Sequence, residues 1–303
     1  MHSRFLWFSL VLASLLLAVL SPQVRHSSNV LPFARNSYAI ELDRRGNELY
    51  NQGKFQESLE VFEQALDVWK KSGSREGEGI ALTAIGLIYC ELQQYAKAME
   101  YTKQALAIAK ETSDRKGEGV LLNNIGLIYN KQGKYNQAFN YYEQALSIAK
   151  EGRDLEAQAL ALNNIGLNYS DLGNYEQALK YYQLSLLLTR SFGQSYWEEK
   201  NLRNIGLVYY KLKQYDQALY YYQQALSLLR KLDNRPNEAK ALNSIGIIYY
   251  ILGDYSLALK FFEEALTINR KIGDFAGARA TRRNIEKARR ALKVPRNISP
   301  VEI

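Results

Sequence analysis

The stretch that decides the fold is "LLNNIGLIYN", residues 121–130, because altered copies of it return along the chain. The copies are "ALTAIGLIYC" (81–90), "ALNNIGLNYS" (161–170), "NLRNIGLVYY" (201–210) and "ALNSIGIIYY" (241–250), so the spacing is always forty residues. A fixed period of roughly 20–50 residues is typical of solenoids, propellers and other arrays. The sequence therefore predicts a repeat architecture.

Each forty-residue unit reads as two helices. In residues 117–151 the apolar positions recur every three or four residues on both sides of "KQGKY" (131–135), which predicts two amphipathic helices joined by a turn. A propeller blade of similar length would show strand-type alternation and several turn signals, and the sequence has neither. The repeats therefore predict an all-α fold of helix-turn-helix units.

The recurring positions resemble the tetratricopeptide repeat. Its pattern runs Leu-Gly, then Tyr, then Ala-x-x-x-Phe, and here it reads Ile125-Gly126, Tyr129 and Ala138-x-x-x-Tyr142. The unit is longer than the usual repeat of roughly 34 residues, and it lacks the proline near the end of the second helix. In this it is similar to the longer repeats of many bacterial, particularly cyanobacterial, proteins, of kinesin light chain and of G-protein-modulator-type adaptors. The resemblance implies a right-handed α-α superhelix with a C-terminal capping helix.

The chain divides into a leader, a linker, the repeats and a cap. We expect a signal peptide or signal anchor at 1–24, a linker at 25–38, a basic capping helix at 279–294 and a tail at 295–303. The six repeats are predicted at 39–78, 79–118, 119–158, 159–198, 199–238 and 239–278.

The leader predicts contact with a membrane. Residues 5–20 are mostly apolar, follow Arg4 and precede Ser-Pro at 21–22. Such a run is slightly long for a signal-peptide core and slightly short for a comfortable membrane span. We expect an exported or membrane-anchored protein, with the bacterial periplasm or inner membrane favoured. Because basic residues follow the run, the cytoplasmic face of a membrane is the alternative.

Composition argues against catalysis. The only cysteine is Cys90, and both histidines, His2 and His26, precede the repeats. This removes Ser-His-Asp, Cys-His and His-ligated metal chemistry from the repeats and rules out an intrachain disulfide. We predict a protein that is not an enzyme and that uses no metal and no cofactor.

The net charge of +8 belongs to the two ends of the chain. Residues 1–38 carry +3 and residues 279–303 carry +6, which leaves the repeats at −1. A nucleic-acid-binding array would carry its basic residues along one face. We therefore expect no nucleic acid among the partners.

The glycine of the repeat predicts a tight helix contact. A glycine inside a helix costs on the order of 1 kcal/mol relative to alanine, so its return in six repeats needs a packing reason. We expect Gly126 and Ala138 to mark the close approach of the two helices of a unit, with tyrosine rings around it. Glycine, alanine and most tyrosines are thus interpreted as packing residues.

The asparagine before Ile-Gly lies elsewhere on the helix. Asn124 is about 200° around the helix axis from Gly126, and the first helices of stacked pairs line the concave side of such a superhelix. The stripes through these asparagines predict a groove that binds a partner. Its residues are Asn124, Asn164, Asn204, Leu127, Leu167, Leu207, Lys131, Lys200 and Lys211.

The resemblance also suggests what the groove holds. In several tetratricopeptide families this asparagine holds the backbone of an extended bound segment, and Asn124, Asn164 and Asn204 fit that role. An amide offers both a donor and an acceptor to a peptide group. The alternative is that these asparagines only bond between adjacent helices, as we expect for Asn123, Asn163 and Asn243. The expected partner is another protein, bound through an extended or helical segment.

The C-terminal helix is strongly basic. Its cations are Arg282, Arg283, Arg289, Arg290 and Lys293. They form either a solvated cap of the array or a surface for an acidic partner or anionic lipid. A structural protein that self-associates into a homo-oligomer, or that binds a membrane surface through this helix, is the alternative to the peptide-binding scaffold.

Overall fold

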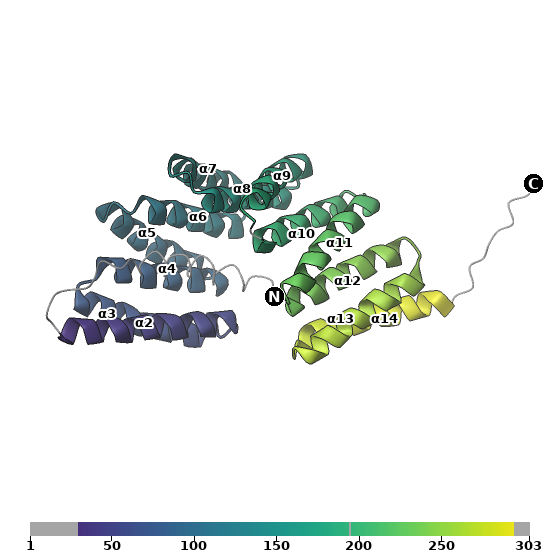
Figure 1. The fold of residues 1–303 in the computed structure, drawn as a ribbon, viewed down its shortest axis with the longest axis horizontal. Coiled ribbons are helices and arrows are strands. Elements are labelled where there is room, and N and C mark those ends of the chain that lie inside the picture. Colours follow the sequence, from purple (N-terminus) through teal and green to yellow (C-terminus); the bar gives the residue numbers. More distant parts are fainter. Residues whose placement is uncertain (1–29, 194, 294–303) are drawn as a thin grey trace, which may run out of the picture. The chain divides into compact units, whose positions relative to one another are not determined.

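The computed structural model of the chain describes residues 30–193 and 195–293. Within these ranges the regular structure is entirely helical (Figure 1), so the predicted all-α class is confirmed. The leader predicted at 1–24 and the tail predicted at 295–303 lie outside the described residues.

Two series of helices alternate along the chain. The first helices of the pairs, called helices A, are α2 (Val30–Asn51), α4 (Arg75–Glu91), α6 (Arg115–Lys131), α8 (Leu155–Asp171), α10 (Ser195–Lys211), α12 (Arg235–Ile251) and α14 (Phe275–Lys293). The second helices, called helices B, are α3 (Phe55–Ser72), α5 (Tyr95–Glu111), α7 (Tyr135–Glu151), α9 (Tyr175–Ser191), α11 (Tyr215–Lys231) and α13 (Tyr255–Lys271).

The chain forms two compact units. Unit 1 spans Met1–Leu172 and contains α2 to α8, and unit 2 spans Gly173–Ile303 and contains α9 to α14. Within each unit, consecutive helices pack side by side and successive helix pairs stack in layers (Figure 1). This stacking of helix pairs is the α-α solenoid that the repeat predicts.

The helices A begin earlier than the apolar pattern suggests. The repeat predicted from residue 79 has its helix α4 from Arg75, and the cap predicted at 279–294 is α14, which begins at Phe275. Side-chain N-caps fix these starts, since Ser74 accepts from the Gly77 N–H at 3.2 Å. Helix α2 begins at Val30, inside the range predicted as linker, so the second half of that linker is helical.

The glycines of five repeats, Gly46, Gly86, Gly126, Gly206 and Gly246, lie against a side chain of helix B. A Cβ on Gly126 would lie 2.6 Å from Cε1 of Tyr142, and one on Gly246 would lie 2.6 Å from Cε1 of Phe262. Real Cβ atoms do not approach a ring so closely, so only glycine fits while the ring stays in place. The predicted close contact is confirmed, and the ring sixteen residues later in the chain is the group that requires it.

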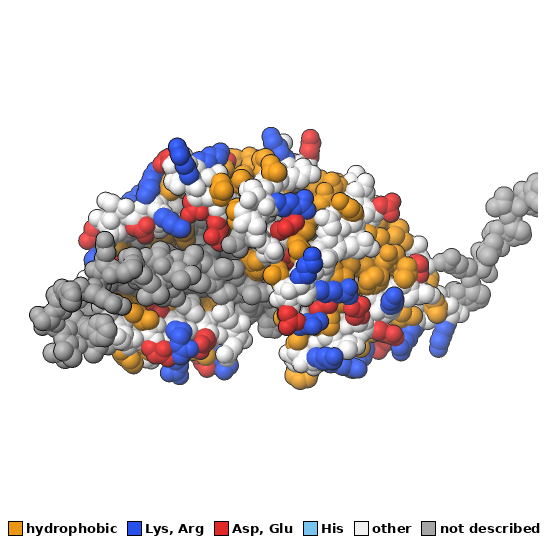
Figure 2. Space-filling model, viewed as in Figure 1, with side chains coloured by type: hydrophobic (Ala, Val, Ile, Leu, Met, Phe, Trp, Pro, Cys, Tyr) orange, Lys and Arg blue, Asp and Glu red, His pale blue; other side chains and the backbone are white. Residues whose placement is uncertain are grey.

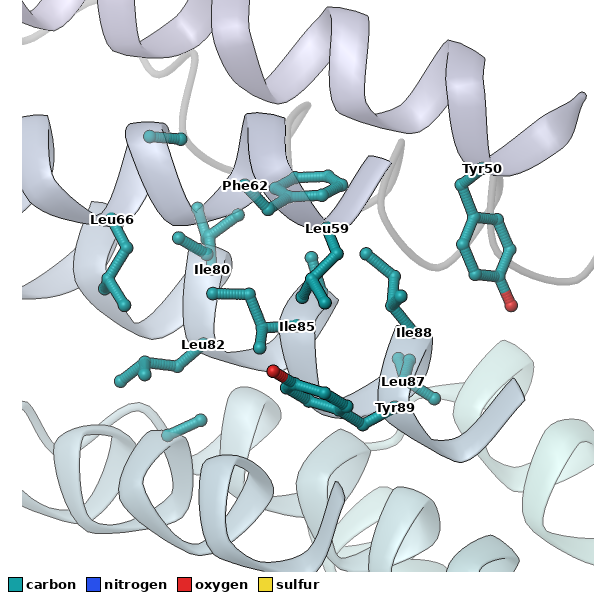
Figure 3. Packing of buried hydrophobic residues seen from close by; sticks show 14 of the residues in the cluster. Tyr50, Leu59, Phe62, Leu66, Ile80, Leu82, Ile85, Leu87, Ile88 and Tyr89 are labelled. Atoms are coloured by element: carbon teal, nitrogen blue, oxygen red, sulfur yellow. The ribbon is translucent and has the colours of Figure 1, made fainter. Parts of the chain in front are cut away.

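The core of the first repeats is also built from close contacts between neighbouring helices. In Figure 3, Leu59 and Phe62 of α3 lie among Ile85 and Ile88 of α4, and all four side chains are buried. Stacked tyrosines flank such cores, as with Tyr129 and Tyr141, whose ring centroids are 5.4 Å apart. Ring stacking adds to the gain from burial.

Candidate binding faces of the helices A

The asparagines predicted to bind a partner in unit 1 are buried. Asn164 on α8 is 1 % exposed, and its Nδ2 donates to Oδ1 of Asn123 on α6 at 2.9 Å. Asn124 is 5 % exposed, and its Nδ2 has no hydrogen-bond partner among the described residues. The predicted bridge through Asn123 is therefore confirmed and engages Asn164. The Asn124 amide is thus a buried donor that no described residue satisfies.

The same bridge recurs in unit 2. Asn284 on α14 donates to Oδ1 of Asn243 on α12 at 3.0 Å, which confirms the bridging role predicted for Asn243. Asn204 on α10 is partly buried. In each bridging pair the two asparagines are 41 positions apart in the sequence. The pairs could therefore have been predicted from this spacing.

The remaining residues of the predicted stripes differ in exposure between the units. In unit 1, Leu127, Leu167 and Lys131 are partly buried. In unit 2, Leu207 is 42 % exposed and Lys211 is exposed. An exposed leucine on the predicted binding face is available for apolar contact with a partner.

Two cavities adjoin in unit 1. Cavity 1, of about 490 Å³, lies between α4, α5 and α6, and its apolar lining includes Ile80 and Ile108. Cavity 2, of about 260 Å³, lies between α6, α7 and α8, and its apolar lining includes Leu160. Val120 and Lys116 belong to the walls of both cavities. The two cavities therefore lie beside the N-terminal parts of three successive helices A, namely α4, α6 and α8.

The polar edges of these cavities are held by their own chain. The Lys116 amine lies 3.0 Å from Oδ2 of Asp154. Burial would raise the pKa of Asp154, but hydrogen bonds from the Ala157 N–H and from Lys116 hold it below its ordinary value. The carboxylate is therefore ionised at neutral pH and keeps Lys116 across the boundary between the cavities.

Sequence reasoning missed both cavities. They exist because small residues, among them Gly79, Ala109, Gly119 and Ala149, stand where longer side chains would fill the space. The signal for them is the difference between one repeat and the next at a given position, whereas the repeat pattern contains only what the repeats share.

The face of unit 2 that carries Lys200 is charged and partly buried. The Lys200 amine lies 5.3 Å from the centre of the Trp197 ring, in cation–π geometry. Nε of Arg203 lies 2.6 Å from Oε1 of Glu199, and this glutamate is 1 % exposed. Burial holds the pKa of Lys200 well below its ordinary value, and Arg203 adds to the effect.

Lys240, one repeat after Lys200, shares this environment. Its amine is buried and has no hydrogen-bond partner among the described residues. Burial and the repulsion of Arg203 lower the pKa of Lys240 to about 8, against the attraction of Asp274 and Glu199. A buried ammonium without a partner is costly, so Lys240 destabilises unit 2 at neutral pH.

The basic side chains of α14 are mostly open to solvent. Arg282, Arg283, Arg290 and Lys293 are exposed, and Arg289 lies 2.9 Å from Glu263 of α13. On the face shown in Figure 2, basic and acidic side chains are interspersed along the described helices. A continuous basic surface does not form on that face.

Two further observations concern only the described residues. None of their helices is long and apolar enough to cross a bilayer, and the leader that predicts a membrane lies outside them. They also hold no group of three or more His, Cys, Asp or Glu side chains arranged to bind a metal ion.

Comparison with known proteins identifies the family. The tetratricopeptide repeat family matches residues 39–111, 118–191 and 198–271, well over half of the chain. The chain therefore belongs to the tetratricopeptide repeat family. No curated protein matches it significantly.

Solved structures share the fold at low sequence identity. Aspartyl phosphate phosphatase F from Bacillus subtilis has a TM-score of 0.64 and 19 % identity, over 95 % of this chain and 79 % of its own. The apo form of the quorum sensor NprR from B. thuringiensis has a TM-score of 0.63 and 19 % identity, over 92 % of this chain and 77 % of its own. A Rap protein complexed with Competence and Sporulation Factor has a TM-score of 0.64 and 15 % identity, over 88 % of this chain and 77 % of its own.

Proposed function

We propose that this protein is a non-catalytic scaffold that holds a peptide segment of a partner protein along its helices A. The observation that carries the proposal is the pair of adjoining cavities of about 490 and 260 Å³ in unit 1, which share Val120. Successive recesses along stacked helices suit the side chains of an extended chain.

The polar groups beside the cavities support the same proposal. Asn124 lies one helical turn after Val120 on α6, and its Nδ2 lacks a partner among the described residues. An unsatisfied buried donor costs about 1–3 kcal/mol. A rotation of the buried side chain towards the groove would let a carbonyl oxygen of a bound backbone satisfy it. In unit 2, Asn204, Leu207 and Lys211 are further candidate contacts.

Two solved structures of the same fold, at 15 and 19 % identity, do not assign a function to this chain, but one of them is a complex. The Rap protein of known structure is complexed with Competence and Sporulation Factor. Another neighbour is named a phosphatase, but likeness at such identity concerns the fold alone. The proposed absence of catalysis rests on the repeats, which contain no histidine and a single, buried cysteine, Cys90.

The test is an array of random twelve-residue peptides probed with the full chain in mild detergent. Val120→Trp would place a large side chain in the shared wall of both cavities, and Asn124→Ala would remove the free amide. We expect Val120→Trp to abolish peptide capture and Asn124→Ala to weaken it about fivefold, the effect of one hydrogen bond. The matched control is Ala107→Trp, which adds the same side chain to an exposed position of α5.

Equal capture by wild type and Val120→Trp would exclude the cavities as the peptide site. Asn164→Ala is not a suitable probe, because it also breaks the bond from Asn164 to Asn123. Its effect on binding could not be separated from its effect on stability.

A second candidate function rests on α14. Four exposed cations, Arg282, Arg283, Arg290 and Lys293, would attract an anionic membrane surface at about 1 kcal/mol each. With an export signal or anchor at the other end of the chain, the protein would then be a membrane-surface structural protein. Flotation with vesicles that contain or lack phosphatidylglycerol tests this, since equal binding to both would exclude an electrostatic role for α14. The mass of the protein in solution tests self-association.

A further inference from the structure

The first space between repeats in unit 1 is filled by the chain's own tryptophan. Trp69 at the end of α3 is 7 % exposed, and its Nε1 donates to Oδ2 of Asp43 on α2 at 3.0 Å. A Cβ on Gly77 at the start of α4 would lie 2.2 Å from Cδ2 of the same ring. Three positions therefore define the place of the indole: residue 69 supplies it, residue 43 accepts its N–H, and residue 77 makes room.

The same three positions recur around cavity 1 with the ring missing. Forty residues after Trp69, Asp43 and Gly77 come Ala109, Thr83 and Gly117, and all three line cavity 1. The glycine is kept, although here a Cβ on Gly117 would lie 2.1 Å from Oδ2 of Asp114, which also lines the cavity. An alanine, Ala109, stands where the ring would start. Cavity 1 therefore lies at the place in its repeat that corresponds to the place of the Trp69 ring.

We propose that cavity 1 receives an aromatic side chain, an indole in preference to others, from the segment that this protein binds. The inference rests on the proposed function and adds to it the chemistry of the anchoring residue. Trp69 shows, one repeat earlier, that a space framed by these positions accommodates an indole and offers an acceptor for its N–H.

The size of the cavity agrees with this occupant. At about 490 Å³ cavity 1 lies within the range of roughly 300–1,000 Å³ common for ligand pockets. Cavity 2, at about 260 Å³, lies below that range. Tryptophan and tyrosine are also the residues that most often anchor a bound protein segment, because they bury a large area at a small cost in conformational entropy.

The polar groups that line cavity 1 also suit an indole. Oγ1 of Thr83 donates to the carbonyl oxygen of Gly79 at 2.7 Å. A hydroxyl oxygen keeps lone pairs when it donates, so Thr83 can accept an indole N–H where Asp43 accepts that of Trp69. In cavity 2 the corresponding Asn123 holds Asn164 of the next repeat through its Oδ1, so an indole N–H there would compete with that bond. Cavity 1 is therefore the better aromatic site of the two.

Exposed side chains border cavity 1 and mark a route of entry. Glu76 and Lys116 line it and are exposed, and Val120 beside them is partly buried. A segment lying over Val120 would bring a side chain to cavity 1 while its backbone passes near Asn124, one helical turn further along α6.

The first experiment uses N-acetyltryptophanamide as the probe and the full chain with labelled isoleucine methyl groups. Ile80 and Ile108 line the cavity, so a ring bound there shifts their methyl resonances through its ring current. We expect saturable shifts with N-acetyltryptophanamide and none with N-acetylleucinamide. Ala109→Trp, which rebuilds the arrangement of Trp69, should abolish the shifts, and Ala107→Trp on the exposed side of α5 should preserve them.

A second variant keeps the test valid if Ala109→Trp folds poorly. Thr83→Val removes the acceptor and retains the shape, so it should lower the preference for N-acetyltryptophanamide over N-acetylphenylalaninamide about fivefold, the effect of one hydrogen bond. The proposal is overturned if neither methyl shifts, or if the shifts persist in a folded Ala109→Trp.

The peptide array separates this inference from the function on which it rests. Capture of peptides enriched in tryptophan, lost in Ala109→Trp, supports both. Capture without aromatic enrichment overturns the aromatic anchor and leaves the scaffold standing. If no peptide is captured, the scaffold function fails and the anchor fails with it, even where the free amide of tryptophan enters the cavity.

Discussion

Units 1 and 2 are built on the same repeat but carry different chemistry on their helices A. At one position unit 1 has Ile80, Val120 and Leu160, whereas unit 2 has Lys200 and Lys240. At a second position of the repeat, unit 1 has Gly117 and Ala157, whereas unit 2 has Trp197 and Asn237. Unit 1 therefore keeps cavities along its helices A, and unit 2 has a buried indole and a cluster of cations. The repeat fixes the contact between helices A and B and leaves the other face of helix A free to vary.

The largest expected effect tests the indole of unit 2. Trp197 is 1 % exposed, so Trp197→Ala should cost about 3–5 kcal/mol of unfolding free energy through lost burial and a new cavity. Urea unfolding followed by far-UV circular dichroism measures this. A cost below about 1 kcal/mol would show that the ring does not hold unit 2 together.

The next effect concerns a buried acid in unit 1. Burial raises the pKa of Asp43 to about 7, although the bond from Trp69 opposes this. The folded state holds the proton of Asp43 more tightly than the unfolded state does. The stability that this protonated carboxyl contributes is therefore complete below about pH 4 and is lost as the pH rises through 7. Asp43→Asn should therefore stabilise the protein at pH 8, by on the order of 2–4 kcal/mol. The measurement is urea unfolding at pH 5 and pH 8, and equal gains at both would contradict the shifted pKa.

A pair of glycine substitutions compares the packing of the two units. A Cβ on Gly126 would lie 2.6 Å from the ring of Tyr142, whereas one on Gly206 would lie 3.2 Å from that of Tyr222. Gly126→Ala should thus cost about 1–3 kcal/mol as overpacking, and Gly206→Ala should cost less. Thermal unfolding of both variants decides this, and the reverse order would mean that the ring of Tyr142 can move aside.

The smallest effect tests the cations of unit 2. The folded pKa of Lys240 is lowered to about 8, so the folded state releases its proton before the unfolded state does, and stability rises with pH from about 8 towards 10. Lys240→Met should be more stable than wild type at pH 7, with an advantage that shrinks as the pH rises through this window. Lys260→Met, at an exposed position of α13, is the control for loss of charge. An advantage that did not change with pH would show that Lys240 is not buried as a cation.

The fold could be predicted from the sequence because the residues that build it recur. Gly126, Ala138 and Tyr142 have counterparts in each repeat, and their contact is local to a helix pair. The candidate site was harder to predict, because it depends on where repeats differ. Asn164 resembles Asn124 in sequence, yet it donates to Asn123 of the preceding repeat. The residue that corresponds to Asn123 one repeat earlier is Thr83, which has no amide. The cavities depend on Ala109 and Ala149, whose small size becomes informative only beside Trp69.

The helix caps carry a consequence for the length of the chain. Each of the links before α4, α6, α8 and α12 ends in a residue whose side chain accepts from an N–H three positions later: Ser74, Asp114, Asp154 and Asn234. The start of each of these helices is therefore set first by its own few residues, and the Asp154 cap is also bonded by a more distant side chain, that of Lys116. If forty residues between two such links were deleted or duplicated, the capping residue of one repeat would be followed by the equivalent helix of another repeat. Whole repeats can thus be gained or lost while each remaining helix keeps its own N-cap. The number of recesses along the array can then change by one repeat at a time.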